Sequence, residues 1–317
     1  MDIVIEKKYL QEAKELHREY PVVDAHLDLA GEILFRHRNG EKEILKKYYL
    51  ESFRNAGIRL VVCSIFVETR ELASGGIYPV LEQVSALLQD MESVSKQFVI
   101  IKQKTDLVKL SQQDKIGLLL FMEGLDVIRT RSSLLYALRE MGIRGASLTW
   151  SRANALANGC CKAGESMQIS GGLTPHGRRT VEHMEKLGLV LDISHLNDDG
   201  IAEIERIATR PYLATHSNLR SVHDNYRNLT DMQLQRLAGH GGVAGINACA
   251  YLVGARRHQN SIEMLCKHIE KMVCLAGAGH TELIKLSAAL LQRGMHKADV
   301  INIIGGNFFR YFFEMLP

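Results

Sequence analysis

The sequence lacks an apolar run long enough to cross a membrane and lacks a paired CxxC motif. Its first twenty residues are charged and amphipathic, which is not the pattern of a signal peptide. We therefore predict a cytoplasmic protein that does not enter a membrane, and free thiols for its six cysteines. Cys63, Cys249 and Cys274 lie in apolar stretches and are predicted to be small core residues.

An excess of one charge is also missing, because the formal net charge is only +3 and is scattered along the chain. This charge is too weak and too scattered to favour binding to nucleic acid or a membrane surface, so we predict neither as a partner. The chain has no low-complexity segment, no Pro/Ser linker and no short repeat. A length of 317 residues suits one large α/β barrel, so we predict a single domain over residues 1–317.

The sequence does contain a recurring unit: a short apolar run, a polar turn and a helical pattern. Runs that are apolar on both faces and separated by helices predict a parallel sheet. Seven such units predict an α/β fold, the (β/α)8 TIM-type barrel, with its eighth strand missing from the sequence. The predicted strands are residues 21–29, 58–67, 116–124, 143–150, 188–195, 211–218 and 241–248.

Ionisable residues stand at the ends of four of these runs. They are His26 and Asp28, then Glu123, His195 and His216. In a parallel barrel the ends of all strands open on one rim, where such barrels keep their chemistry. Each residue alone has an ordinary alternative, a helix cap for a carboxylate or a backbone hydrogen bond for a histidine. Together, at equivalent positions, they predict a metal centre.

Five ligands exceed the needs of one tetrahedral zinc ion. Two metals that share a carboxylate, separated by about 3.5–4 Å, fit the set better. Such a pair acidifies a water to a hydroxide nucleophile and polarises a carbonyl group, so metal-assisted hydrolysis is the predicted reaction class.

These residues lie in segments that resemble the membrane (renal) dipeptidase family, zinc peptidases with bacterial members. The matching segments include "VVDAHLDLA", "LLFMEGLD", "GIRGASLTW", "LDISH", "ATHSN" and "GGNFFRYF", which span most of the chain. The resemblance implies two zinc ions per chain, a dipeptide substrate, often with a D-residue at its C-terminal position, and a homodimer. It assigns one zinc to His26, Asp28 and Glu123 and the other to Glu123, His195 and His216, with the catalytic Glu123 as the bridge.

Two further residues are predicted to bind substrate. Arg227, in "NYRNLTD", matches the family arginine that receives the substrate carboxylate, for which a planar guanidinium is suited. A surface arginine is the alternative, and the nearby Arg220 is expected to be structural. Trp150 is the only tryptophan and stands where the renal-type enzyme has a histidine. It either walls the substrate side chain or packs in the core.

One departure from the family is large. After His280 the family continues with a strand that carries an aspartate, but this chain passes directly to Thr281 and a helix. That aspartate would handle the proton passed to the leaving nitrogen. Asp192 is predicted to lie too deep to replace it. A barrel with two unpaired edges is unfavourable, which favours a stretch omitted from the sequence over a damaged family member.

Three functions remain open from the sequence. The first is a binuclear zinc dipeptidase. The second is another amidohydrolase-type barrel enzyme, although those commonly use a His-x-His pair on the first strand and a metal-binding lysine on the fourth. The third is a non-catalytic zinc-binding protein of the same family, which only the missing aspartate supports.

Overall fold

Five of the seven predicted runs form hydrogen-bonded strands of one parallel sheet, which confirms the α/β fold. The structure is a computed structural model that describes residues 4–160, 171–254, 261–276 and 284–317. The sheet has six strands in the order β1-β2-β4-β5-β6, with β3 paired to the first half of β4. The strands are β1 Val22–Leu27, β2 Ile58–Phe66, β3 Phe98–Ile100, β4 Ile116–Glu123, β5 Ile143–Ser147 and β6 Val190–Asp192.

The last two predicted runs continue the sheet by single bridges instead of full strands. Leu213 pairs in parallel with Asp192 of β6, and Ala214 pairs in parallel with Ala244. The backbone N–H of Ser217 donates to the carbonyl of Gly245 over 2.7 Å. The two runs therefore occupy the sixth and seventh places in the order that the barrel prediction requires.

Helix α7 begins and ends at residues with clear capping signals. Thr174 caps α7 by accepting from the backbone N–H of Gly177, and Gly188 ends that helix with a left-handed φ of 69°. The α-helices are α1 Lys7–Glu19, α2 Leu29–Arg38, α3 Leu50–Ala56, α4 Ile77–Glu92, α5 Lys104–Gln112, α6 Leu134–Glu140, α7 Pro175–Leu187, α8 Asp198–Ile207, α9 Asp231–Gly239, α10 Ala250–Val253, α11 Ser261–Ala276, α12 Ile284–Gln292, α13 Lys297–Ile301 and α14 Asn307–Met315.

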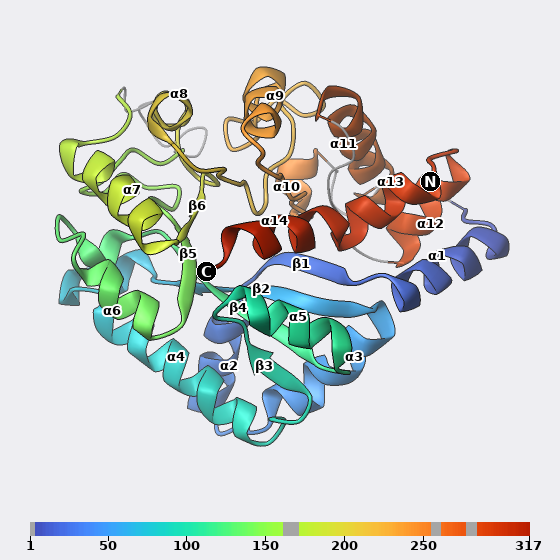
Figure 1. The fold of residues 1–317 in the computed structure, drawn as a ribbon, viewed down its shortest axis with the longest axis horizontal. Helices are drawn as coiled ribbons and strands as arrows, with labels where there is room; N and C mark the ends of the chain where they lie inside the picture. The colour runs from blue at the N-terminus through green and yellow to red at the C-terminus, as the bar shows by residue number, and fades with distance from the viewer. Residues whose placement is uncertain (1–3, 161–170, 255–260, 277–283) are drawn as a thin grey trace.

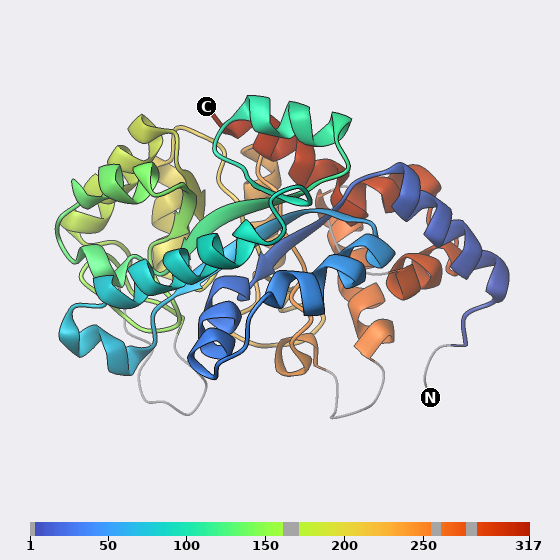
Figure 2. The ribbon, with the colours of Figure 1, turned by 90° about the horizontal axis from the view of Figure 1, so that it is seen from below.

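The two faces of the sheet are covered by different helices. Figures 1 and 2 show α2 and α4 on one side of the sheet and α14 running along β1 on the other. Phe308 and Phe312 of α14 belong to the apolar cluster that contains Val62, Leu119 and Phe121 of the strands. The strands that carry the predicted site are thus fixed between two apolar layers.

Not every burial prediction is correct. Cys63 is buried, but Cys249 and Cys274 are exposed. Cys249 lies where the chain leaves the 241–248 run and enters α10, and Cys274 lies two turns after the exposed Lys267 on α11. The burial prediction was wrong for these two cysteines because an apolar stretch does not show which of its residues face outward.

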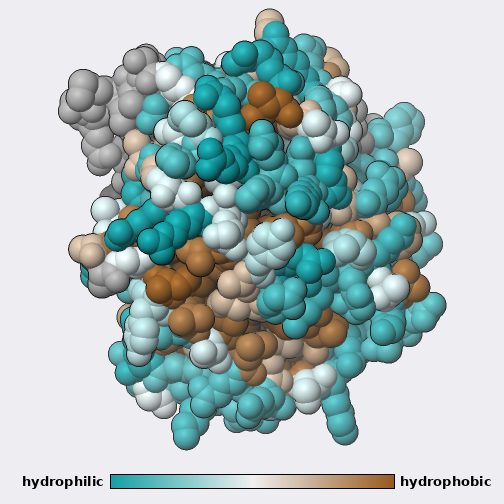
Figure 3. All heavy atoms as spheres, turned by 60° about the vertical axis from the view of Figure 1, so that its left-hand side comes forward, coloured by the Kyte–Doolittle hydropathy of each residue, from teal (hydrophilic) through white to brown (hydrophobic). Residues whose placement is uncertain are grey.

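The face seen in Figure 3 is mostly hydrophilic and carries one patch where apolar side chains gather. Across the described ranges, no helix combines the length and the apolar character needed to span a membrane. The predicted position of the missing eighth strand, between His280 and Thr281, lies outside the described residues.

Candidate metal centre

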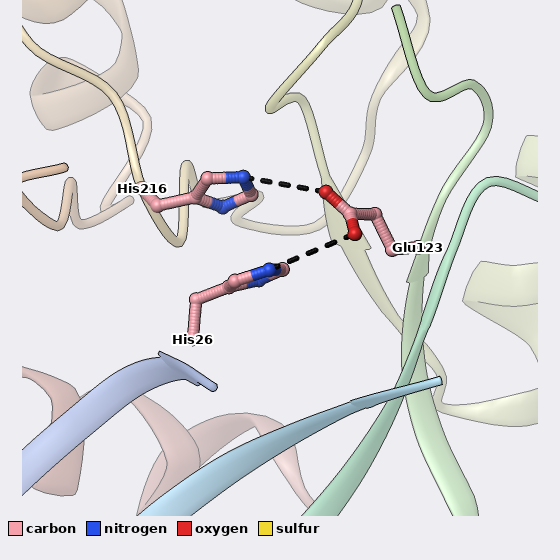
Figure 4. A group of neighbouring side chains, drawn as sticks. All are labelled: His26, Glu123 and His216. Atoms are coloured by element: carbon pink, nitrogen blue, oxygen red, sulfur yellow. Dashed lines mark ion pairs between the residues drawn. The ribbon is translucent and has the colours of Figure 1, made fainter. Parts of the chain in front are cut away.

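The carboxylate of Glu123 lies between His216 and His26 and directs one oxygen to each (Figure 4). Its Oε1 is 2.8 Å from Nε2 of His195 and 3.4 Å from Nε2 of His216. Its Oε2 is 3.7 Å from Nε2 of His26. The last residue of β4 is thereby in contact with residues from β1 and from the two segments beyond β6.

The nitrogens of His195 and His216 are also close to each other. Their Nε2 atoms are 3.0 Å apart, and both side chains are buried. Two ring nitrogens at this distance need a proton or a metal ion between them, because two lone pairs repel. A zinc ion with bonds of about 2.0–2.1 Å would place neighbouring ligand atoms roughly 3.3 Å apart. Glu123 Oε1 and the two Nε2 atoms therefore have the spacing of three ligands of one metal ion.

On the other side of Glu123, His26 and Asp28 form a second pair. Nε2 of His26 is 3.6 Å from Oδ1 of Asp28, which is too long for a good hydrogen bond but fits two ligands of one ion. Asp28 occupies the N-cap position of α2, yet its side chain makes no capping hydrogen bond. The helix-cap alternative does not account for this carboxylate.

Burial and mutual charge set the protonation of the centre. Burial opposes charge on Glu123, but His26, His195 and His216 together hold the pKa of its carboxyl well below the usual range. Burial also opposes charge on His26, but the carboxylates of Glu123 and Asp28 outweigh it and raise the pKa to about 9. The metal-free centre is therefore an ion pair between Glu123 and His26, which a metal would replace.

The other two histidines are held neutral. Burial and the nearby Arg227 guanidinium lower the pKa of His195 to about 4. Burial, the charge on His26 and Arg227 lower the pKa of His216 well below its usual value. Neutral imidazole is the form that binds metal ions.

Local backbone geometry brings these side chains together. Gly124 follows Glu123 with a φ of 84°, and an added Cβ would lie 2.6 Å from Oδ2 of Asp126. Only glycine suits this turn. His195 has a φ of 72°, an uncommon conformation for a residue with a side chain. Backbone of this kind concentrates at functional sites.

Arg227 lies next to the centre and is 7% exposed. Its Nη1 donates to Ser217 Oγ over 2.9 Å and its Nη2 to the carbonyl of His216 over 2.9 Å. Its Nε donates to Nδ1 of His195 over 3.2 Å. Arg220, by contrast, forms a two-point ion pair with Asp198, in agreement with its predicted structural role.

Trp150 is half-buried, and its ring lies beside the centre. The centroids of the Trp150 and His195 rings are 5.8 Å apart, and Phe66 packs on Trp150 with its ring centroid at 5.2 Å. A cavity of about 560 Å³, lined by His26, Asp28 and Phe66 among others, opens beside these residues. Its volume is in the range of small-molecule sites.

Sequence reasoning missed the role of two buried residues near the histidines. Asp192 lies deep, as predicted, but it is not isolated: its Oδ2 accepts from the hydroxyl of Thr215 over 2.5 Å. The Oγ1 of Thr215 is in turn 2.7 Å from Nδ1 of His216. The signal in the sequence was weak, because only the polar residues around the histidines in "LDISH" and "ATHSN" marked the two segments.

Comparison with known proteins identifies the family of this chain. The model of the family described as membrane dipeptidase (peptidase family M19) matches residues 10–315. An uncharacterised protein of Acinetobacter calcoaceticus is 29% identical over 197 residues, which are 61% of this chain and 62% of that protein. Dipeptidase tcpJ of Claviceps purpurea is 24% identical over 254 residues, which are 74% of this chain and 59% of that protein.

A solved structure supports the fold. The metallo peptidase from Rhodobacter sphaeroides, crystallised with a phosphinate mimic of the dipeptide L-Ala-D-Ala, superposes with a TM-score of 0.84. The match covers 94% of this chain and 99% of that chain at 21% identity. The chain spans about three fifths of the length of the two curated relatives above.

Proposed function

Because the chain belongs to the membrane dipeptidase family, peptidase family M19, we propose that it is a binuclear zinc dipeptidase. Its metal ligands would be His26, Asp28 and Glu123 for one ion, and Glu123, His195 and His216 for the other. A cytoplasmic location and a homodimer remain predictions from the sequence.

The observation that carries this proposal is that the two carboxylate oxygens of Glu123 face different ligands. One oxygen faces His195 and His216, and the other faces His26. A carboxylate with one oxygen directed to each side suits a bridge between two ions. The conformation supports two sites instead of one, because a single ion could not contact both oxygens and all three histidines with tetrahedral geometry.

When bound, two zinc ions supply an acidified water and polarise the scissile carbonyl. The residues of the chain orient the substrate for that chemistry. Arg227 is buried and forms no ion pair with any carboxylate in the described part of the chain. A buried charge without a counterion is unfavourable, so the site calls for an anionic ligand. The carboxylate at the end of a dipeptide would supply that charge.

The hydrogen bonds of Arg227 leave room for such a ligand. A guanidinium has five N–H groups, and three of them donate to Ser217, His216 and His195. One N–H remains on each terminal nitrogen. This pair can bind a carboxylate through both of its oxygens. The cavity lined by Phe66, on which Trp150 packs, would then receive a substrate side chain.

The test combines zinc titration of the metal-free protein with hydrolysis of a dipeptide panel. We expect about two zinc ions per chain, and zinc-dependent cleavage by a protein whose gene encodes an aspartate between His280 and Thr281. The variant Glu123→Gln should lose affinity at both sites, because the bridging oxygen no longer carries charge. Glu203→Gln is the matched control, since Glu203 is also buried but bonds to Leu173 and Arg178 instead.

Each other outcome points to a different function. One zinc ion or none, with no gain on zinc addition, would contradict the binuclear centre. Two ions without cleavage of any dipeptide would favour the non-catalytic protein. Two ions with cleavage only of other amides or of lactones would favour another barrel hydrolase.

A further inference from the structure

We propose that Asp192, acting through the hydroxyl of Thr215, holds His216 in the tautomer that binds a metal ion. The three side chains form an unbroken series of short contacts, from Asp192 Oδ2 to Thr215 Oγ1 and from Thr215 Oγ1 to His216 Nδ1. Asp192 and Thr215 are 6% and 1% exposed, so water does not compete for these bonds. The inference rests on the proposed metal centre.

The direction of the hydrogen bonds follows from the chemistry of the groups. An ionised carboxylate only accepts, so the single proton of the Thr215 hydroxyl is donated to Asp192. The hydroxyl oxygen can then only accept from His216. The proton of the neutral imidazole is therefore on Nδ1, and the lone pair of Nε2 faces Nε2 of His195.

Asp192 is itself held in place by the backbone. Its Oδ1 accepts from the N–H of Ser194 over 2.8 Å and from the N–H of Thr215 over 3.2 Å. Because two backbone N–H groups donate to it, the atom at the Oδ1 position must be an oxygen. The other oxygen, Oδ2, is left for the Thr215 hydroxyl.

His195 has the opposite arrangement. Its Nδ1 accepts from Nε of Arg227, so its proton is on Nε2 and lies between Glu123 Oε1 and the lone pair of His216 Nε2. Binding a metal through Nε2 requires this proton to move to Nδ1, where the Oγ of Ser151, 2.9 Å away, can accept it. His216 alone of these two histidines is ready to bind without a change of tautomer. Asp192 and Thr215 are thus positioning residues for the centre.

The decisive variant is Asp192→Asn. The two backbone donors keep the amide oxygen at the Oδ1 position, so the amide nitrogen must face Thr215. It would donate to the hydroxyl, and the hydroxyl would then donate to Nδ1 of His216. The imidazole proton would move to Nε2 and block the metal. The asparagine has nearly the same shape as the aspartate, but it reverses donor and acceptor in both hydrogen bonds of the series.

The experiment has two readouts. In the metal-free protein, ¹⁵N NMR of the histidine rings should show Nε2 of His216 without a proton in the native chain and with a proton in Asp192→Asn. In a zinc titration against a competing chelator, Asp192→Asn and Thr215→Val should bind about 10–100-fold more weakly, and Thr215→Ser should bind as the native chain does. Thr180→Val, which removes a buried hydroxyl in α7, is the control and should change nothing.

The same His216 tautomer in the native chain and in Asp192→Asn would overturn the proposal, as would native zinc affinity in Asp192→Asn. Thermal unfolding identifies any variant that does not fold, and if Asp192→Asn fails to fold, Thr215→Val against Thr215→Ser still tests the hydroxyl, with equal zinc affinity in both contradicting the proposal. If the native chain binds no zinc, the proposed function fails. The NMR measurement on metal-free protein still decides the hydrogen-bond series on its own.

Discussion

At the scale of single residues, the clearest prediction concerns Arg227. Replacing it with alanine should cost about 2–4 kcal/mol in kcat/KM, the scale for removing one partner of a buried charge pair. Arg227→Lys should recover only part of this loss, because an ammonium lacks the planar fork. Steady-state kinetics on free and amidated dipeptides measure the effect.

The control for this variant is Arg220→Ala, which removes a nearby arginine that pairs with Asp198. The native protein should strongly prefer the free carboxylate over the amide, and Arg227→Ala should lose that preference. Equal rates on both substrates in the native protein would show that Arg227 has another role.

The sequence predicted which side chains come together better than it predicted their protonation. His26, Glu123, His195 and His216 could be read from their positions at the ends of apolar runs, because a strand direction places its end on a known rim. The tautomer of His216 depends on Thr215 and on Asp192, 24 residues away from it along the chain. Contacts of this kind depend on how neighbouring segments pair, which no local pattern shows.

At the scale of elements, α11 is tied to its neighbours by a histidine that must stay neutral. Nδ1 of His268 accepts from the backbone N–H of Leu219, and Nε2 donates to the carbonyl of Val253 in α10. Burial lowers the pKa of His268 to about 4. Protonation of Nδ1 would break the bond to Leu219.

The sign of the pH effect follows from this pKa. Above pH 6.5 the side chain is neutral in both states and contributes no pH dependence. Between pH 6.5 and 4 only the unfolded chain takes up the proton, so folding stability falls as pH falls, by at most about 3 kcal/mol. Urea unfolding at pH 7.5 and pH 5 should show this loss, and the loss should be smaller in His268→Gln. Equal losses in both proteins would assign the effect to other groups.

The sequence predicted a strand correctly where the apolar run was long. Runs 58–67 and 116–124 became the long strands β2 and β4, whereas β3 was missed because it has only three residues. The 211–218 and 241–248 runs pair only by bridges. An added Cβ on Gly242 would lie 2.2 Å from the carbonyl oxygen of Tyr212, so glycines bring these two segments close together at the cost of regular strand geometry.

At the scale of the whole molecule, the predicted absence of an eighth strand has a consequence for catalysis. A cavity of about 700 Å³ borders Ile246 and Ala248, in the run that an eighth strand would adjoin. The deep carboxylate of Asp192 is already bonded to Thr215, so it is not free to protonate a leaving amine. Protonation of a leaving group by a positioned acid typically accelerates a reaction by about 10²–10⁴-fold. A protein of these 317 residues alone should therefore bind zinc but be unstable or nearly inactive.

Two measurements check this. An intact mass clearly above 35.6 kDa would show that the gene encodes an additional stretch, and dipeptide cleavage by that longer protein should be fast. A mass of 35.6 kDa together with fast cleavage would show that another group protonates the leaving amine.

The packing of α14 against the strands has a consequence for synthesis on the ribosome. All predicted metal ligands are made by residue 216, but Phe308 and Phe312, which cover Val62 and Phe121, come about 90 residues later. At roughly 5–20 residues per second, the apolar face of the sheet stays uncovered for about 5–20 s. During that interval the growing chain exposes a surface that chaperones bind. Ribosome-arrested chains released before residue 307 should therefore be cut rapidly by protease, whereas chains that include residue 316 should resist.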